Sequence, residues 1–581
     1  MAQNVLRTHS RSRSFTALAA GGSMLTAGAG VGTFATALFI GLAGPAGATT
    51  FTVSNTNNNG VGSLPQAIID ANAATGADTI DFAPGVAGMI NLTTDFPDIT
   101  DSLTITGPGS AALTISGNTL YHAFALKTVD NGTVTISGLT VTGSSTLWSG
   151  LDGGAIYALN TSVNLDDVVL SNNTSHTASG GGIWIDNSAG IGTVTITNSV
   201  ISQNSVTGVG GGSYGSLGGG GAVILADEVT ISNTKIDHND ATQIGGLAVS
   251  ANIVTIDATT ITDNTDSESV GGLLVQSRNL TVSDSVISGN TSDGFVGGVY
   301  LFDTTYKGTG AGTLSITNTR ISDNASNGIG GGAIASLYQA HATSLDNLTV
   351  TGNTGGSGSL FGASSVGGLA VLGDVTLTNS TIADNTGVGI DVLDASDLTT
   401  TWTLAASATL RPTRQAFNYD TNLTVAHSTI SGNSLQGIAS QELLPITPGS
   451  VPSAVSPSAP APAPAVLTVT LDHVLAANNG AEDVAVPATA TFSLIQKPNA
   501  SLIAGTGTVT GVDPGLKPLE RISDTVSVVP IAMGSAAWNA GNPNFMPPPA
   551  TDQRGLPRVV DVIDIGAYEV QEQLLLPKFT G

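Results

Sequence analysis

The fold is decided by the stretch Val194-Thr195-Ile196, which is followed by Ile201 and Asn204. The phrase returns about every 30 residues, a typical unit length in repeat proteins, as Val229-Thr230-Ile231 with Ile236 and Asn239, and as Val254-Thr255-Ile256 with Ile261 and Asn264. A unit this short cannot bury its own apolar face, so it is stabilised by stacking on its neighbours. The sequence therefore predicts a solenoid.

Each unit is expected to supply three strands. Val194 and Ile196 face inward while Thr195 faces solvent, because successive side chains of a strand point to opposite sides. Ile201 opens a second strand, and a third follows a glycine pair, as in Gly245-Gly246-Leu247. Three parallel strands per coil, with about 4.8 Å between coils, make an all-β fold that is a single parallel β-helix.

One asparagine recurs at the same turn of every unit. Stacked in register, each side-chain amide donates to the carbonyl of the next, and asparagine tolerates the left-handed turn conformation. One residue type at one turn of each coil is what stacking requires, so we interpret the column as structural rather than as a ligand site. Its members are Asn173, Asn204, Asn239, Asn264, Asn290, Asn324, Asn353, Asn385 and Asn433.

Composition and charge exclude several functions. The 581 residues are 40% apolar but only 4% aromatic, 10% are charged, and 74 are glycine, which suits many short strands and tight turns. A net charge of −26 repels phosphate backbones, so we expect no nucleic-acid binding. Cysteine is absent, which excludes disulfides, thiol nucleophiles and zinc–thiolate sites.

The N-terminus predicts export. Arg7, Arg11 and Arg13 precede an uncharged stretch from Phe15 to Ala43, and Ala46-Gly47-Ala48 is a small-x-small cleavage pattern. We therefore expect a signal peptide over 1–48, a secreted or cell-surface protein, and no stable membrane span after cleavage. An uncleaved membrane anchor is the alternative, since the stretch is long enough to span a bilayer.

The rest of the chain divides by composition. Ser63 and Gln66 form a capping pattern that predicts a helix starting at Leu64. The longer spacing after Asn385 predicts a loop or hairpin around Thr400 to Tyr419. The expected organisation is an N-terminal cap and first coils over 49–130, β-helix repeats over 131–440, a mobile Pro/Ala/Ser-rich insertion over 441–466, last coils and a C-terminal cap over 467–570, and a tail over 571–581.

Two motifs resemble those of a known family. Gly62-Ser63-Leu64-Pro65-Gln66-Ala67-Ile68 resembles a Gly-Ser-Leu-Arg-Gln-Ala-Ile cap, although Pro65 replaces the arginine and any ion pair it makes. The stretches 552–558 (DQRGLPR) and 564–569 (DIGAYE) resemble the family's closing motif. Over residues 51–569 the chain is similar to bacterial surface proteins that have a right-handed parallel β-helix, a pectin-lyase-like fold, and a choice-of-anchor Q domain.

The resemblance implies a right-handed helix, export and surface display, and it implies no known reaction. In the closing motif, Arg554 and Arg558 lie in sequence among Asp552, Asp564 and Glu569. We interpret these residues as paired charges that close the far end of the stack, rather than as a catalytic site.

An enzyme is the alternative function, because parallel β-helices also host polysaccharide lyases and glycoside hydrolases. Hydrolysis needs two carboxylates about 5 to 10 Å apart, and a lyase needs a basic residue beside a metal or carboxylates. The candidate catalytic residues flank the asparagine turn: Asp237, Asp240, Asp263 and Asp266, with His238 beside them and Asp293 one coil further. No Lys or Arg has an evident place beside them, so we interpret them as solvated turn charges, with weak calcium binding as the second interpretation. No other metal or cofactor is expected.

The glycine-led strands carry the candidate binding residues. Tyr157, Trp184 and Tyr300 hold equivalent places in their coils, and we expect Ile224, Val249 and Val275 to lie between them in the column. Such a column would present aromatic side chains to a sugar or protein partner, while packing under loops is the alternative. These strands are apolar at nearly every position, so alternation does not fix their register.

We therefore expect an exported, monomeric, non-enzymatic β-helix protein with a role in adhesion, binding or structure. Its expected partner is a carbohydrate or a cell-surface protein.

The first prediction concerns export. Secreted protein should begin at Thr49, because signal peptidase cleaves after the small residues that end at Ala48. Intact-mass measurement of secreted material tests this, and a species that retains Phe15 to Ala43 would show a membrane anchor instead.

Overall fold

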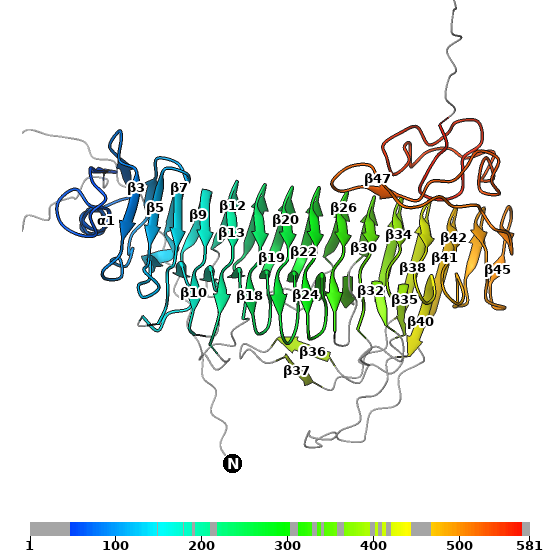
Figure 1. The fold of residues 1–581 in the computed structure, drawn as a ribbon, viewed down its shortest axis with the longest axis horizontal. Helices are drawn as coiled ribbons and strands as arrows, with labels where there is room; N and C mark the ends of the chain where they lie inside the picture. The colour runs from blue at the N-terminus through cyan, green and yellow to red at the C-terminus, as the bar shows by residue number, and fades with distance from the viewer. Residues whose placement is uncertain are drawn as a thin grey trace, which may run out of the picture. The chain divides into compact units, whose positions relative to one another are not determined.

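The computed structural model describes residues 47–571, except 148, 178, 189–191, 209–217, 303–311, 328–333, 338–341, 357–364, 395–400, 405–409, 414–419 and 443–465. The chain from Gly47 onward winds into a stack of coils along one axis (Figure 1). The predicted signal peptide, apart from its last two residues, and nearly all of the Pro/Ala/Ser-rich insertion lie outside the described residues.

Successive coils are joined by three ladders of parallel strands. The first ladder carries the Val-x-Ile pattern and contains β1 (Thr50–Val53), β2 (Asp78–Phe82), β4 (Leu103–Thr106), β12 (Thr193–Thr197), β16 (Glu228–Ser232), β26 (Thr313–Thr317), β30 (Ala342–Asp346), β33 (Asp374–Thr378), β38 (Thr421–Ala426), β41 (Leu467–Asp472), β43 (Thr489–Thr491) and β45 (Ile503–Ala504). Long strands turn the corner between ladders: β7 (Thr133–Thr142) and β9 (Ser162–Ser171) lead from the first to the second, and β19 (Leu247–Asp257) and β22 (Leu273–Ser283) lead from the third to the first.

The second ladder carries the later isoleucine of each unit, which is the middle residue of its strand in Val200–Ser202, Lys235–Asp237 and Thr260–Thr262. It contains β3 (Gly88–Asn91), β5 (Leu113–Ser116), β13 (Val200–Ser202), β17 (Lys235–Asp237), β20 (Thr260–Thr262), β23 (Val286–Ser288), β27 (Arg320–Ser322), β31 (Thr349–Thr351), β34 (Thr381–Ala383), β39 (Thr429–Ser431), β42 (Leu475–Ala477), β44 (Leu494–Ile495) and β46 (Val509–Thr510). A short sheet follows it at the asparagine turn, formed by β10 (Thr174–Ser175), β14 (Ser205–Val206), β18 (Asp240–Ala241), β21 (Thr265–Asp266), β24 (Thr291–Ser292) and β28 (Ala325–Ser326).

The third ladder follows the glycine pairs. It contains β6 (Phe124–Leu126), β8 (Ile156–Leu159), β11 (Ile183–Asp186), β15 (Ala222–Leu225), β25 (Val299–Phe302), β29 (Ile334–Leu337), β32 (Val366–Val371), β35 (Val388–Asp394) and β40 (Ile438–Glu442). Two antiparallel pairs lie outside the ladders: β36 (Thr401–Leu404) with β37 (Leu410–Thr413), in the region where a hairpin is predicted, and β47 (Glu520–Arg521) with β48 (Ser527–Val528). One 3₁₀ turn, η1 (Val129–Asn131), precedes β7.

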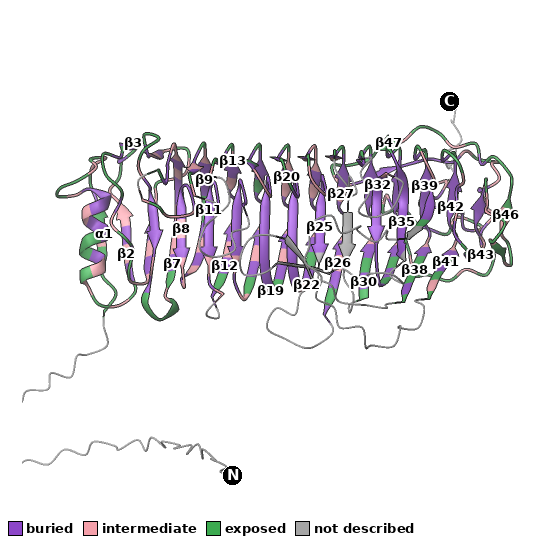
Figure 2. Cartoon of the chain, turned by 90° about the horizontal axis from the view of Figure 1, so that it is seen from below, coloured by how far each residue is buried: buried purple, intermediate pink, exposed green. Residues whose placement is uncertain are grey.

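Identical apolar residues stack in register to fill the core. Ile196 pairs with Ile231 and Ile231 with Ile256, and all three are fully buried. Each such side chain contributes roughly 1.5–3 kcal/mol when removed from water. Buried residues line the full length of the stack (Figure 2). The predicted parallel β-helix with three strands per coil is confirmed.

The helix α1 (Leu64–Ala73) starts where the capping pattern predicts it. Ser63 Oγ accepts a hydrogen bond from the Gln66 backbone N–H at 3.3 Å, whereas the Gln66 side chain donates to Asp70 and does not return to Ser63. Leu64 and Ile68 are fully buried and join the core of the first coil. The helix lies at the N-terminal end of the stack (Figure 2).

The asparagine ladder is present, and every amide in it points the same way. Asn239 Nδ2 donates to Asn264 Oδ1 at 2.9 Å and to the Ile201 carbonyl of the preceding coil at 2.9 Å, so one side chain links three coils. The pattern runs from Asn173 through Asn433 and continues to Asn479. Asn479 Nδ2 then donates at 2.8 Å to Asp483, whose buried carboxylate ends the ladder.

A second, more exposed ladder runs in the opposite direction at the turn between the first and second ladders of strands. Asn233 Nδ2 donates to Asn198 Oδ1 at 2.7 Å, and Asn198 Nδ2 donates to Asp166 at 2.7 Å. Further along, Asn347 donates to Asn318, and Asn318 donates to Asp284. Each ladder therefore ends on an aspartate, a residue that accepts hydrogen bonds without donating them when it is ionised.

Residues 523–570 form a closing segment that packs on the flank of the stack, from the coil of Asn318 to the coil of His473. Thr525 Oγ1 donates to Asn318 at 3.1 Å, Arg558 donates to Asn379, and the Gly566 N–H donates to the His473 carbonyl. Figure 1 shows these loops in red along one side of the stack. At the end itself the first-ladder strands shorten, from six residues in β41 to three in β43 and two in β45. Short edge strands resist pairing with other chains.

None of the described helices is long and apolar enough to cross a membrane.

The ladder generates a stability prediction. Asn264→Ala should cost on the order of 1–3 kcal/mol, because it leaves buried donors and acceptors of two neighbouring coils without partners. Thr255→Ala, on the solvent-facing side of the same coil, should cost well under about 1 kcal/mol. Denaturant midpoints compare the two, and equal midpoints would contradict the stacking argument.

Candidate functional site

The outward row of the third strand ladder holds the candidate binding residues. Tyr157 pairs with Trp184, which pairs with Val223, and Leu274 pairs with Tyr300. The expected neighbours Ile224, Val249 and Val275 are wrong by one position. They continue the row of Ile185, which pairs with Ile224, and this row points into the core. The residues that lie between the aromatic ones are Val223, Ala248 and Leu274.

The faces of the Tyr157 and Trp184 rings point toward each other, along the helix axis. Tyr157 and Trp184 stack with their centroids 4.9 Å apart and an interplanar angle of 12°. The Lys127 ammonium lies 5.7 Å from the Tyr157 centroid and 2.9 Å from Asp98 Oδ2. A sugar platform needs a free ring face, whereas the Tyr157 ring contacts Trp184 and lies beside Lys127.

Burial differs among the three aromatic residues. Trp184 is 7% exposed and Tyr300 is 6% exposed, and both belong to an apolar cluster with Val223, Ala248 and Leu274. Burial also raises the pKa of the Tyr300 hydroxyl. Tyr157 is half-buried. The accessible part of the row is therefore the Tyr157 end, next to Lys127 and Asp98.

One acid lies in the same outward row. Asp391 pairs with Ala370 and Ala439, is fully buried, and in the described part of the chain neither of its carboxylate oxygens has a hydrogen-bond partner. Burial raises its pKa to about 8, so the group is mainly protonated at neutral pH.

The candidate catalytic aspartates are held by the fold, beginning with Asp237. Its Oδ2 lies 2.9 Å from Lys235 Nζ and 2.7 Å from His238 Nδ1. The expectation that no basic residue stands beside this group is therefore wrong. Burial acts to raise the pKa of Asp237, but hydrogen bonds from Lys235, His238 and Ser202 outweigh it and lower the pKa overall.

The other aspartates serve turns and loops. Asp240 is exposed and accepts the Thr265 hydroxyl at 2.7 Å. Asp263 has a φ of 55°, and its carboxylate occupies the space that a Cβ at Gly289, one coil further, would enter. Asp266 accepts backbone N–H groups from Glu268 and Ser269, and burial raises its pKa to about 7. Asp293 accepts the Asn327 amide at 2.8 Å.

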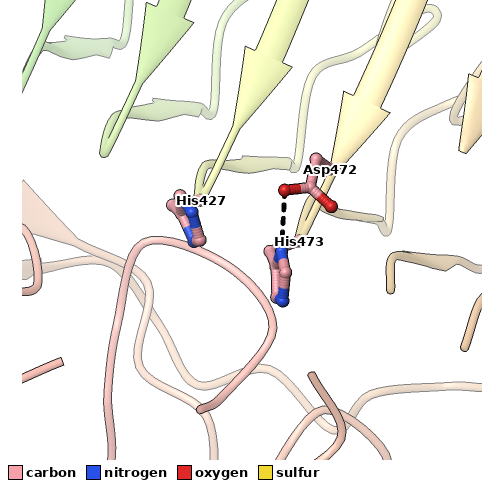
Figure 3. Close-up of side chains that lie close together, drawn as sticks. All are labelled: His427, Asp472 and His473. Carbon is pink, nitrogen blue, oxygen red and sulfur yellow. Dashed lines mark ion pairs between the residues drawn. The ribbon is translucent and has the colours of Figure 1, made fainter. Parts of the chain in front are cut away.

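Across the described residues, one group of three histidine and acidic side chains brings a ligand atom from each within 4.8 Å of the others: His427, Asp472 and His473 (Figure 3). The four candidate aspartates form no such group. His427 and His473 occupy the turn position that Asn379 holds one coil earlier, and both have positive φ. Comparing this turn between repeats is the signal that would have revealed them.

The chemistry of this group fits a ring stack better than a metal site. His427 and His473 lie 4.7 Å apart at 21°, and Phe492 continues the stack 5.3 Å beyond His473. The Asn542 N–H donates to His473 Nε2 at 3.0 Å, so the ring proton sits on Nδ1, 3.0 Å from Asp472. A metal ion on Nδ1 would move that proton to Nε2, where it would meet the Asn542 N–H.

The closing segment covers this stack and buries its own charges. Phe545 contacts both histidine rings edge-on, at 5.1 and 5.6 Å. Burial, followed by the positive charge of Arg558, lowers the pKa of His427 to about 3. Arg558 is fully buried and donates to the Gly566 carbonyl at 2.8 Å and to Asn379. Burial lowers the pKa of its guanidinium to about 10. Arg554 forms the predicted ion pair, with Asp552, whereas Arg558 bonds to uncharged groups. The prediction that these charges close the far end of the stack is wrong, because they lie on its flank, against Asn379 and Thr429.

The acids of the closing segment cap its turns. Arg554 lies 2.6 Å from Asp552 and 3.7 Å from the Tyr568 ring centroid. Glu569 accepts the Asp564 N–H at 2.9 Å, and Asp564 accepts the Val570 N–H at 2.6 Å. Burial raises the pKa of Asp564 to about 6, and burial together with Asp564 raises that of Glu569 to about 8.

A known family model matches part of this chain. Residues 98–217 and 214–368 match the family model described as a right handed beta helix region. The chain is a right-handed parallel β-helix. The A-module of mannuronan C-5 epimerase AlgE6 from Azotobacter vinelandii is 13% identical with a TM-score of 0.37, over 78% of this chain and 96% of that chain. Pectate lyase Pel9A is 14% identical with a TM-score of 0.32, over 90% of this chain and 96% of that chain. No curated protein matches this chain.

The raised pKa of Glu569 generates a pH prediction. The folded protein keeps the Glu569 proton up to a pH of about 8, while the unfolded chain releases it near 4.5, so the free energy of unfolding should fall as pH rises through this window. Glu569→Gln should make that fall shallower by up to about 1.4 kcal/mol per pH unit.

Urea midpoints measured between pH 5 and 8 test it. Glu228→Gln, at an exposed position of β16, is the control and should leave the slope unchanged. A slope unaffected by Glu569→Gln would contradict the burial argument.

Proposed function

We propose that this protein is an exported, non-catalytic β-helix that acts at the cell surface or outside the cell by binding a carbohydrate or a surface protein. One observation carries the proposal: every aspartate of the candidate catalytic set already has a role in the fold. Asp237 is ion-paired, Asp240 and Asp266 accept hydrogen bonds, and Asp263 forms a left-handed turn. A general acid and base must instead be free to meet a substrate proton.

The Tyr157 end of the outward row is the proposed contact. Tyr157 is half-buried, and Lys127 and Asp98 beside it keep side-chain exposures of 35% and 47%. An aromatic edge next to two charges of opposite sign offers both apolar area and polar contacts to a ligand. Trp184 supports this end of the row by stacking on Tyr157, whereas Tyr300 lies five coils further along the same row.

Export and anchoring complete the proposal. The basic N-terminus, uncharged stretch and Ala46-Gly47-Ala48 support secretion. The residues that resemble a choice-of-anchor Q motif support a role in surface display. They form one connected unit through Arg554, Asp552 and Glu569, and this unit adheres to the flank of the coils.

A test separates binding from catalysis. Changing Asp237, Asp240, Asp263 and Asp266 together to Asn should leave ligand binding intact, and neither the variant nor the wild type should release reducing ends or unsaturated products from neutral or acidic polysaccharides. A glycan array, run with calcium and with chelator, identifies the ligand used for binding. Turnover in the wild type that disappears with the aspartates would establish the polysaccharide lyase or hydrolase instead.

A second set of variants tests the contact itself. Tyr157→Ala should weaken ligand retention while the denaturation midpoint changes little, because the ring is partly in water. Tyr300→Ala should lower stability by about 3–5 kcal/mol, because it empties a buried site. Unchanged retention in a folded Tyr157→Ala variant would contradict the proposed contact.

A further inference from the structure

A straight row of hydroxyl groups runs along the solvent-facing side of the first strand ladder. We call it the hydroxyl row, and all members except Asn164 are Thr or Ser: Thr104, Thr135, Asn164, Thr195, Thr230, Thr255, Thr281, Ser315, Ser344, Thr376, Thr424, Thr470 and Thr489. Each is half-buried or exposed. The pairing keeps one register from end to end, so the row is roughly 60 Å long with about 4.8 Å between members.

Most hydroxyls of this row are free, whereas several of those beside it are bonded; Thr135 is the exception in the row, because it accepts a hydrogen bond from the Asn164 amide at 3.3 Å. In the flanking row two residues further along each strand, Thr197 donates to Asp166 at 2.7 Å, and Thr491 donates to Asp472 at 2.8 Å. From Thr195 to Thr489, by contrast, no row hydroxyl has a hydrogen-bond partner among the described residues. The fold therefore uses several flanking hydroxyls internally and leaves the central ones from Thr195 to Thr489 available to a ligand.

Charge and area limit what that ligand can be. The hydroxyl row carries no charge, although the chain has 42 acidic residues. The acids of this face, such as Asp166 and Asp257, stand in the flanking rows and accept neighbouring hydroxyls. Three rows about 6.6 Å apart along each strand make a face of roughly 800 Å², which is close to one side of a standard specific interface.

Periodicity selects among uncharged ligands. A ligand that repeats with the same spacing as the coils can contact many coils at once. Its affinity then rises with each contact, because the entropy of association is lost only once. Among the described outward positions of this ladder, from β4 to β43, there is no aromatic ring on which a sugar could stack. The exposed large apolar residue at these positions is Ile253. Evenly spaced methyl and hydroxyl groups can instead order a layer of water with their own spacing.

We propose that the hydroxyl row binds a face of ice. The free hydroxyls take positions in an ordered water layer, and the threonine methyl groups pack against that layer. The ligand is an extracellular lattice, so the inference rests on the proposed export for its biological setting. It does not depend on the Tyr157 contact.

Incorporation into ice tests the proposal directly. Purified full-length protein should enter a slowly grown ice shell above the level of a non-binding protein of similar size and charge, and it should give measurable thermal hysteresis. Thr255→Arg with Thr281→Arg should reduce incorporation to the level of the non-binding protein, because two long charged side chains hold the lattice away from the row. Incorporation of the wild type at the reference level would overturn the proposal.

The matched control places the same two substitutions on the same two coils but on another face. Thr260→Arg with Val286→Arg, at half-buried paired positions of β20 and β23, should leave incorporation unchanged. Equal loss in both double variants, with denaturation midpoints equal to the wild type, would overturn the assignment of the face. Retention of the wild type on microcrystalline cellulose without entry into ice would overturn it in favour of a polysaccharide.

These measurements use purified protein, so they are independent of export. The proposal of export is contradicted by a different result, a mass of secreted material that retains an uncleaved anchor. The proposal of binding at Tyr157 is tested by the glycan experiment alone.

Discussion

The stack depends on one buried amide per coil meeting the next. A buried amide without a partner costs about 1–3 kcal/mol, and here each asparagine satisfies the following one while also reaching back to the preceding coil. The turn that carries the asparagine is therefore fixed in every coil. The chain between successive asparagines varies from 25 to 48 residues. Uniformity is required at this turn and is relaxed elsewhere, which explains how a regular core coexists with long excursions.

The two asparagine ladders also need their ends satisfied. An amide donates and accepts, so a chain of amides always leaves a donor at one end. Asp483 accepts that donor for the buried ladder, and Asp166 and Asp284 accept it for the exposed one. The exposed ladder's turn then changes residue type to His427, His473 and Phe492, whose rings stack and receive the closing segment. The turn thus passes from a hydrogen-bonded column to an aromatic column where it becomes covered.

Most of the fold could be predicted from sequence because its determinants are local and repeated. The alternation in Val194-Thr195-Ile196 and the spacing to Asn204 predict strands, faces and ladder. The faces of the third strand cannot be assigned in this way. Ile183-Trp184-Ile185 is apolar throughout, so there is no alternation of apolar and polar residues to show which side chains point inward. For this reason the sequence alone places Ile224 in the outward row, whereas the structure has Val223 there.

The candidate site was harder to predict, for two different reasons. Lys235 and Asp237 lie two residues apart on one strand, so their side chains share a face. The period of two in the sequence therefore suffices to predict this ion pair. The contact of Arg558 with Asn379 joins residues 179 positions apart, and no local pattern encodes it. The resemblance of the closing motif located these charges in sequence, but only the folded chain places them on the flank.

The one-way ladder bears on how such a molecule can change length. Every interior coil offers the same donor upward and the same acceptor downward, so duplicating one coil inserts a unit whose two contacts are already complementary. Each duplicated coil would thus lengthen the molecule by about 4.8 Å without requiring any new contact between coils. The last coils are exempt, because Asp483 breaks the identity of the units there. Coils can therefore be duplicated in the interior of the stack but not at its C-terminal end, so a longer protein of this kind would keep the same last coils.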